Sequence, residues 1–158
     1  LSSIVEDITG YRWTFDGKDG LTDLDMGLPT LLGGVDGVFV TIPGREPSVG
    51  ASLALERLGQ AAADAVARHD LDPARSDEAR LLKYVTVLDT PESSAEAFDT
   101  QIRYLYLRIT GIPLEEKAPE PAELTALWKQ VYSVEGSATR AWAGVLSAVL
   151  RDPRVIFY

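Results

Sequence analysis

The sequence predicts a compact, mainly α-helical domain of about five helices with a small β element near residues 38–42. Apolar residues recur at the three- and four-residue spacing of a buried helix face in several segments, and glycine or proline follows those segments. β-branched and aromatic residues are dense in only one short run, where the strand is expected. A length of 158 residues is typical of one domain, so residues 1–158 are expected to share a single core.

Composition and charge exclude several classes of protein. With 46% hydrophobic and 25% charged residues, the chain has the composition of an ordinary globular protein. Every apolar stretch is interrupted well before the ~20 residues that a membrane-spanning helix needs, so no transmembrane segment is expected. The net charge of -9 and the scattered arginines and lysines disfavour nucleic acid as a partner. The absence of cysteine excludes thiolate metal sites, iron–sulfur clusters and covalent haem in this chain.

The first part of the chain alternates short elements with loops. Residues Ile4–Thr9 predict a short helix, which Gly10 ends in a left-handed conformation. Aromatic and polar residues then alternate over residues 11–15, and this pattern predicts a brief strand or extended segment. Aspartates and glycines crowd residues 16–27, which is typical of a loop. The strand is expected after this loop, at residues 38–42.

Two helices are predicted between the strand and residue 85. Ser48 is a suitable N-cap for a long helix that runs to about His69. One face of that helix carries leucine and alanine at helical spacing and is expected to be buried; its members are Leu55, Leu58, Ala62 and Ala65. A shorter helix is predicted over residues 76–85, and it ends before a turn at residues 89–91.

The last three predicted helices have the strongest patterns. Residues 98–109 and 121–135 each predict an amphipathic helix that a glycine ends. Ser137 is expected to cap the final helix, in which the apolar residues keep helical spacing without a miss; they are Ala138, Ala141, Trp142, Val145, Leu146, Val149 and Leu150. Trp128 and Trp142 lie on the apolar faces of their helices, so we expect both rings in the core.

Four aspartates in the loop at residues 16–27 are candidate metal ligands, because calcium prefers several hard oxygen ligands. They are Asp16, Asp19, Asp23 and Asp25. Their intervals of 3, 4 and 2 residues do not match the ligand positions of an EF-hand loop. The segment is therefore either a calcium loop of another kind or a solvated loop rich in turns, and no other cofactor is predicted.

No catalytic motif is recognisable. His69 is the one histidine and falls at the end of a predicted helix, where a capping or surface role is the simpler interpretation. The chain has no G-x-S-x-G nucleophile motif. The candidate carboxylate pairs are Glu6–Asp7 and the group of Glu115–Glu116 with Glu120, but adjacent acids do not face each other on a helix. The glycines at residues 32–37 do not follow a phosphate-binding order.

A family resemblance is carried by residues 104–132, YLYLRITGIPLEEKAPEPAELTALWKQVY, and 136–158, GSATRAWAGVLSAVLRDPRVIFY. These segments resemble the helical domains of unknown function found beside haem-c domains in large secreted planctomycete-type proteins. Residues 4–13, IVEDITGYRW, resemble the opening helix of those domains. The resemblance implies an exported, periplasmic or envelope-associated setting and a neighbour that bears a c-type cytochrome. It assigns no reaction and no catalytic residue.

Our first hypothesis is a non-catalytic accessory or interaction domain of an exported, cytochrome-associated protein, because an acidic surface suits a basic partner. The alternatives are a hydrolase with an acidic active site that forms only in the fold, and a calcium-stabilised binding module. The apolar residues 155–158 are expected to dock on the domain or on a partner, or to mark a cut in the chain. The start at Leu1 favours a piece of a larger or processed exported protein.

Overall fold

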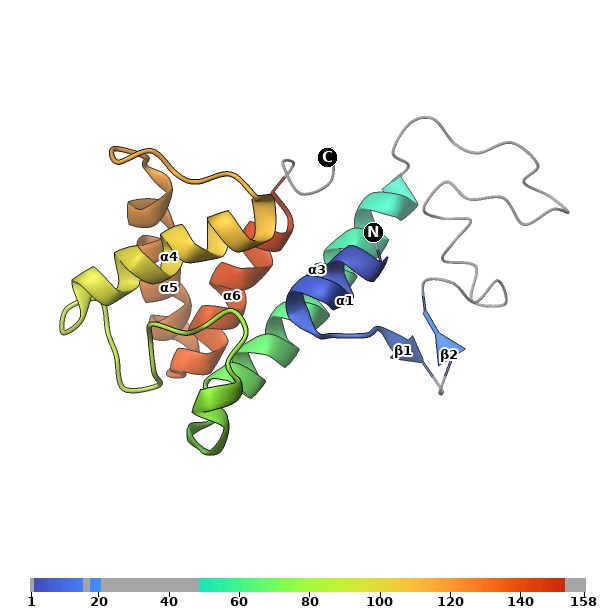
Figure 1. The fold of residues 1–158 in the computed structure, drawn as a ribbon, viewed down its shortest axis with the longest axis horizontal. Coiled ribbons are helices and arrows are strands. Elements are labelled where there is room, and N and C mark those ends of the chain that lie inside the picture. Colours follow the sequence, from blue (N-terminus) through green and yellow to red (C-terminus); the bar gives the residue numbers. More distant parts are fainter. Residues whose placement is uncertain (1, 16–17, 21–48, 153–158) are drawn as a thin grey trace, which may run out of the picture.

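The computed structural model describes residues 2–15, 18–20 and 49–152, and this part of the chain is mainly helical, as predicted (Figure 1). The strand predicted near residues 38–42 lies outside the described residues. The elements in chain order are α1 (Ser2–Thr9), β1 (Thr14–Phe15), β2 (Lys18–Asp19), α3 (Val49–Asp70), the 3-10 helix η2 (Pro73–Glu78), α4 (Ala95–Thr110), α5 (Glu120–Glu135) and α6 (Ala138–Leu150).

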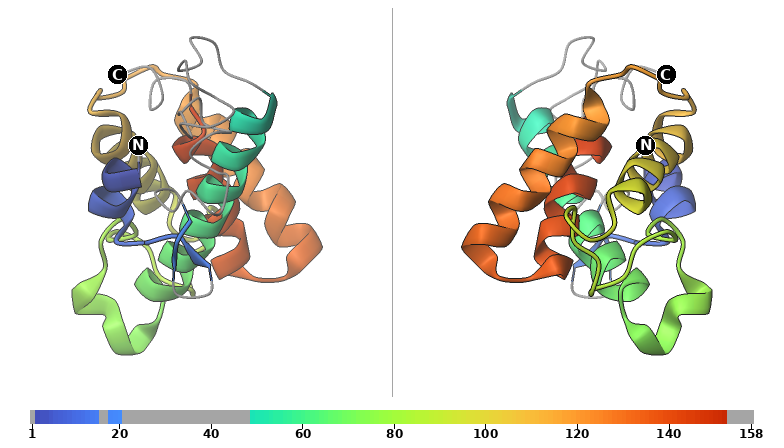
Figure 2. Two further views of the ribbon diagram at one scale, coloured as in Figure 1. Left: turned by 90° about the vertical axis from the view of Figure 1, so that its right-hand side faces the viewer. Right: turned by 90° about the vertical axis from the view of Figure 1, so that its left-hand side faces the viewer.

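Helix α6 is the centre of the arrangement. It lies between α3 and α5 and packs along both of them, while α4 crosses in front of α5 (Figure 1). Helix α1 packs against α3. The turned views show η2 projecting at one end of the molecule, beyond the end of α3 (Figure 2). Among the described helices, α6 has the most continuous apolar face, which suits a helix that packs against α3, α4 and α5.

The two short strands form a small antiparallel pair. Thr14 lies opposite Asp19 and Phe15 opposite Lys18. The backbone N–H of Gly20 donates to the carbonyl of Trp13 at 2.8 Å, which extends the pairing by one hydrogen bond. The extended segment predicted at residues 11–15 therefore includes a strand, and its partner follows it directly in the chain.

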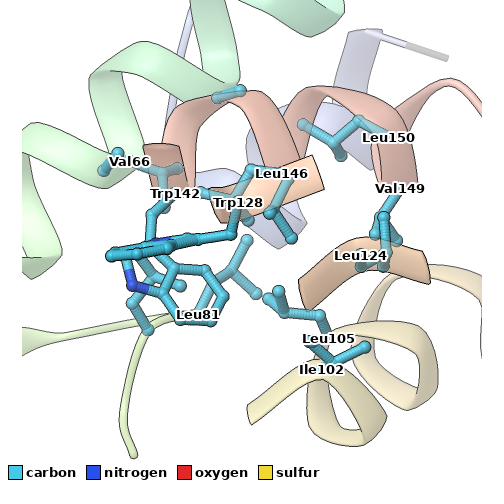
Figure 3. Packing of buried hydrophobic residues seen from close by; sticks show 14 of the residues in the cluster. Val66, Leu81, Ile102, Leu105, Leu124, Trp128, Trp142, Leu146, Val149 and Leu150 are labelled. Carbon is cyan, nitrogen blue, oxygen red and sulfur yellow. The ribbon is translucent and has the colours of Figure 1, made fainter. Parts of the chain in front are cut away.

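The core confirms most of the predicted helix faces. All the residues predicted on the apolar face of α6 are buried except Ala138, which is partly buried, and the predicted apolar residues of α4 are buried as well. Trp142 and Trp128 are both enclosed in the core (Figure 3). The ring of Phe98, from α4, contacts both of them, with centroids 4.9 Å from Trp142 and 5.2 Å from Trp128. On α5, Leu124 and Trp128 are buried, whereas Leu127 is only partly buried.

The buried face of α3 is wider than its sequence pattern indicated. Leu58 and Ala62 are buried as predicted, but Ala65 is partly exposed, and the side chain of Leu55 is outside the described residues. The alanines next to the predicted face are buried too, because α3 is covered by both α6 and α1. Small side chains at these positions let the helices approach closely, which the alanine-rich composition of α3 had suggested.

The helix predicted over residues 76–85 is wrong. The 3-10 helix η2 ends at Glu78, and no regular helix follows until α4 begins at Ala95. The backbone groups of this connection bind to side chains instead. The backbone N–H groups of Leu81 and Leu82 donate to one carboxylate oxygen of Asp70, at 2.7 and 2.9 Å.

Gln101 completes the anchoring of this connection. Its side-chain oxygen accepts the N–H of Tyr84 at 2.9 Å, and its side-chain N–H donates to the carbonyl of Leu81 at 2.7 Å. Gln101 is fully buried, so these bonds lie inside the core. They place Leu81 and Leu82 in the core without requiring a helix, since a buried backbone group needs a partner but not a helical one.

Gly10 ends α1 in the left-handed conformation that the sequence predicted, with a φ of 69°. We expect Gly10→Ala to lower the free energy of unfolding by about 1–2 kcal/mol, because an L-residue is strained there. A Cβ atom would also overlap the guanidinium of Arg80, but that exposed side chain can move aside at little cost. Urea unfolding followed by circular dichroism measures the loss.

Gly59→Ala is the control for Gly10→Ala, because it is not expected to lower stability. Gly59 lies inside α3, and a Cβ there would make an ordinary contact at 3.4 Å with Cγ of Arg151. Gly59→Ala is therefore expected to leave stability unchanged or to raise it by about 0.5–1 kcal/mol, because alanine favours the helix. Equal losses from Gly10→Ala and Gly59→Ala would contradict the assignment of Gly10 to a backbone role.

Candidate functional site

The proposed calcium loop lies mostly outside the described residues. Asp16, Asp23 and Asp25 are not described, and Asp19 is described only through its backbone position in β2. Within the described ranges, no group of three or more histidine, cysteine, aspartate or glutamate side chains is placed to hold a metal ion. The calcium loop therefore stays a prediction.

His69 and Asp70 are the arrangement closest to a catalytic pair. Nδ1 of His69 lies 2.9 Å from one carboxylate oxygen of Asp70, and Nε2 lies 3.7 Å from Glu78. A serine-hydrolase triad needs a hydroxyl at the second imidazole nitrogen, and among the described residues no hydroxyl group hydrogen-bonds to His69. The other oxygen of Asp70 holds the backbone of Leu81 and Leu82. This geometry supports a structural link between α3 and η2.

The candidate acidic pair Glu115–Glu116 is exposed in the connection between α4 and α5. The backbone carbonyls of these two residues accept hydrogen bonds from Arg103 at 2.8 and 3.0 Å, and Arg103 also pairs with Asp99 at 2.7 Å. The arrangement fixes the loop on α4. It supplies no pair of carboxylates facing each other across a cleft, which is the geometry that glycoside hydrolysis uses.

The shifted carboxyl pKa values also differ from those of an acid catalyst, whose pKa is raised. Hydrogen bonds from the side chains of Ser94 and Thr86 hold the pKa of Asp89 below its ordinary value of 3.8. A hydrogen bond from Lys129 lowers the pKa of Glu92 from its ordinary 4.5. Both carboxyl groups are therefore stabilised in their charged form, which suits a role in structure or recognition.

The connection before α4 contains a tightly bonded turn, which we call the 86–94 turn. One oxygen of Asp89 accepts the backbone N–H and the hydroxyl of Thr86, at 2.7 and 2.8 Å. The other oxygen accepts the hydroxyl of Ser94 at 2.6 Å. The turn at residues 89–91 was predicted from sequence, but this network depends on residues on both sides of it and was not.

The 86–94 turn holds large apolar side chains in water. Leu88 is 85% exposed, and its backbone N–H donates to the hydroxyl of Thr86 at 3.3 Å. Val87 is also exposed, as is Tyr84 in the same connection. Of these residues, only Tyr84 falls within the helix predicted over residues 76–85, and no sequence pattern indicated that Val87 and Leu88 are exposed.

A hollow of about 400 Å3 lies between the start of α4 and the first half of α5, and we call it the α4–α5 hollow. Its walls are small, chiefly Ala95 from α4 and Ala122 and Ala126 from α5, with the buried ring of Phe98 beneath. Lys129 lines it and forms an ion pair at 2.7 Å with Glu92, the residue next to Pro91 on the opposite side. The residues that line the hollow come from two helices, so no spacing pattern within one segment indicated it.

Acidic residues are concentrated in this half of the molecule. Residues 86–135 contain nine aspartates and glutamates but only four lysines and arginines, so they carry more than half of the chain's net charge of -9. Several of these acids are exposed and form no ion pair within the described part of the chain; examples are Glu96 and Glu123. Residues 86–135 as a whole therefore attract cations.

Two further results concern membrane-spanning helices and similar proteins. Among the described helices, none has both the length and the apolar composition needed to span a bilayer. A scan against protein-family models found no match, and searches of curated proteins and of solved structures found none either.

Proposed function

We propose that this chain is a non-catalytic interaction domain that docks on a basic partner protein through the 86–94 turn and the acidic surface beside it. The observation that carries the proposal is the presentation of Leu88, which is 85% exposed on a turn fixed by the carboxylate of Asp89. An exposed apolar residue is ordinary by itself. Leu88 differs because hydrogen bonds hold the backbone of its turn, so the backbone entropy has already been lost before the partner arrives.

The neighbouring apolar residues enlarge this surface. Val87 is exposed next to Leu88, and the two residues line the same groove; Tyr84, also exposed, lies four residues before Leu88 in the same connection. Aromatic and aliphatic groups of this kind dominate the energetics of protein interfaces. The surplus of acids in residues 86–135 adds attraction for a basic surface and accelerates association.

The resemblance to domains found beside haem-c domains suggests which basic partner to test first. A c-type cytochrome with a lysine-rich face has the charge that this surface favours. The exported, envelope-associated setting is part of the same proposal, since it rests on that resemblance. The hydrolase alternative has less support, because the His69–Asp70 pair is committed to holding neighbouring segments.

The test is a capture experiment with the immobilised chain. We expect the wild-type chain to retain a basic c-type cytochrome, or other basic proteins of a native envelope extract, at about 0.05 M salt and to release them near 1 M, where the Debye length falls to about 3 Å. Leu88→Ser is expected to weaken retention at least tenfold, because it removes an apolar side chain from the centre of the contact.

Leu107→Ser is the matched control, because Leu107 is also exposed but lies on α4, outside the 86–94 turn. It should retain the partner as the wild type does. Equal retention by the wild type and Leu88→Ser would contradict the proposal. A screen on ester, glycoside and peptide substrates runs alongside, and turnover that a single aspartate or glutamate substitution abolishes would favour the hydrolase instead.

A further inference from the structure

The α4–α5 hollow lies close to Leu88 along the chain. Pro91, which lines the hollow, is three residues after Leu88, so the Cα atoms of the two residues are at most about 11 Å apart. A protein interface of ordinary size covers roughly 800 Å2 on each partner. An interface of that size at Leu88 is large enough to extend to the edge of the hollow, and the chemistry of the hollow indicates what a partner that extends there contacts.

The interior of the hollow is apolar. Alanine side chains form its walls, and their small size leaves open space above Phe98, whose ring is 1% exposed. Thr125 also lines it, but its hydroxyl donates to the carbonyl of Pro121 at 2.7 Å, within α5. The space thus favours an aliphatic side chain, which gains free energy by leaving water.

The chain on the α4 side of the hollow is rich in acids, one of which, Asp99, lines it. Residues 91–99 contain Glu92, Glu96 and Asp99 and no lysine or arginine. Among the described residues that line the hollow, Lys129 is the one cation, and Glu92 holds it at 2.7 Å. Asp99 is bound by Arg103, but about half of its side chain remains exposed. Glu96 is exposed and has no ion pair within the described residues.

We infer that the α4–α5 hollow receives an aliphatic side chain carried by a basic segment of the partner protein. The aliphatic group fills the space above Phe98, and lysine or arginine residues on either side of it lie beside Glu96 and Asp99. A second copy of this chain does not fit the same requirement, because two chains of charge -9 repel each other. This inference rests on the proposed function and specifies the partner's chemistry at one part of the surface.

The probe for this site is a fluorescein-labelled peptide in which lysines flank a single leucine. We expect its fluorescence anisotropy to rise with the concentration of the wild-type chain at low salt. A peptide with serine in place of the leucine should bind at least about tenfold more weakly, a difference of about 1.4 kcal/mol, because serine gains little by leaving water. A peptide with glutamates in place of the lysines should not bind.

Ala126→Trp fills the hollow from its α5 wall and is expected to weaken peptide binding at least tenfold. Ala148→Trp is the matched control, because Ala148 is an exposed alanine on α6 that lines a different groove. Circular dichroism establishes that both variants fold. Glu96→Lys changes an exposed side chain next in the chain to Ala95, which lines the hollow, and tests the charge requirement separately, with Glu123→Lys on α5 as its control.

The outcomes separate the two proposals. Peptide binding that is lost in Ala126→Trp and weakened in Glu96→Lys, but retained in both controls, supports the inference. Equal binding by Ala126→Trp and the wild type, or equal binding of the leucine and serine peptides, overturns it. If Leu88→Ser still abolishes capture of the partner in that case, the proposed function stands while the role of the hollow is rejected.

Discussion

Trp142→Ala is expected to lower the free energy of unfolding by roughly 3–5 kcal/mol, which is a large share of the 5–15 kcal/mol typical of a domain. Trp142 is completely buried on α6 and contacts the ring of Phe98, with the ring centroids 4.9 Å apart. The ring of Trp128 lies 6.5 Å from that of Trp142 and 5.2 Å from that of Phe98, so the three rings form one cluster. Truncation leaves a cavity where α4, α5 and α6 meet. Urea unfolding followed by far-ultraviolet circular dichroism measures the loss.

Trp142→Phe separates the packing of the ring from the cost of its polar atom. Nε1 of Trp142 is buried and has no hydrogen-bond partner among the residues that the structure describes, and burying such a group costs about 1–3 kcal/mol. Phenylalanine removes that group while it keeps most of the apolar contact, so its effect should be clearly smaller than that of alanine. Leu107→Ala, at an exposed position, should change stability by less than about 0.5 kcal/mol. Superimposable unfolding curves for Trp142→Ala and the wild type would refute the core assignment.

Asp70→Ala is the second substitution with a large expected effect, a loss of roughly 2–5 kcal/mol. Asp70 is 5% exposed, and one of its oxygens accepts the N–H groups of both Leu81 and Leu82. Without the carboxylate, two backbone donors remain buried and unpaired, and each costs about 1–3 kcal/mol. We expect the connection before α4 to loosen first, which hydrogen exchange at Leu81 and Leu82 detects directly.

Asp70→Asn and Asp72→Ala are the controls for this prediction. Asparagine keeps an oxygen that can accept both N–H groups, so it should lose much less stability than alanine does. Asp72 also accepts a backbone N–H, from Ala74 at 3.0 Å, but this bond is exposed at the start of η2. Its removal should cost about 0.5–2 kcal/mol, as for other helix caps. If Asp70→Ala and Asp72→Ala are equally stable, the buried hydrogen bonds are not the source of the effect.

The local physics of the sequence predicted the helices well. The long α3, the amphipathic α6, and the glycines at residues 111 and 136 that end α4 and α5 all follow from helical spacing and from the left-handed conformation that glycine adopts easily. The side chain of Ser137 accepts the N–H of Arg140, as expected of an N-cap. These features involve residues within one or two turns of each other, so the sequence alone contains the information.

The proposed surface also combines features that depend on nearby residues with features that depend on distant ones. The sequence indicated a turn at residues 89–91 and an acidic chain, and both contribute to the proposed surface. It did not indicate that Leu88 is exposed or that small residues of α4 and α5 enclose a hollow. Both depend on which segments become neighbours, and a spacing pattern within one segment does not specify that.

By itself, the sequence determined that the chain is mainly helical, where most of the helices end, and that its surface is acidic. Only the tertiary structure decided the path of residues 79–94. Their apolar residues have a spacing compatible with a helix, but Asp70 from α3 and Gln101 from α4 bind their backbone groups. These partners are 11 to 20 residues away in the chain. Once such distant side chains satisfy the buried N–H and C=O groups, the helix loses its advantage, and the connection is free to hold Leu88 in solvent.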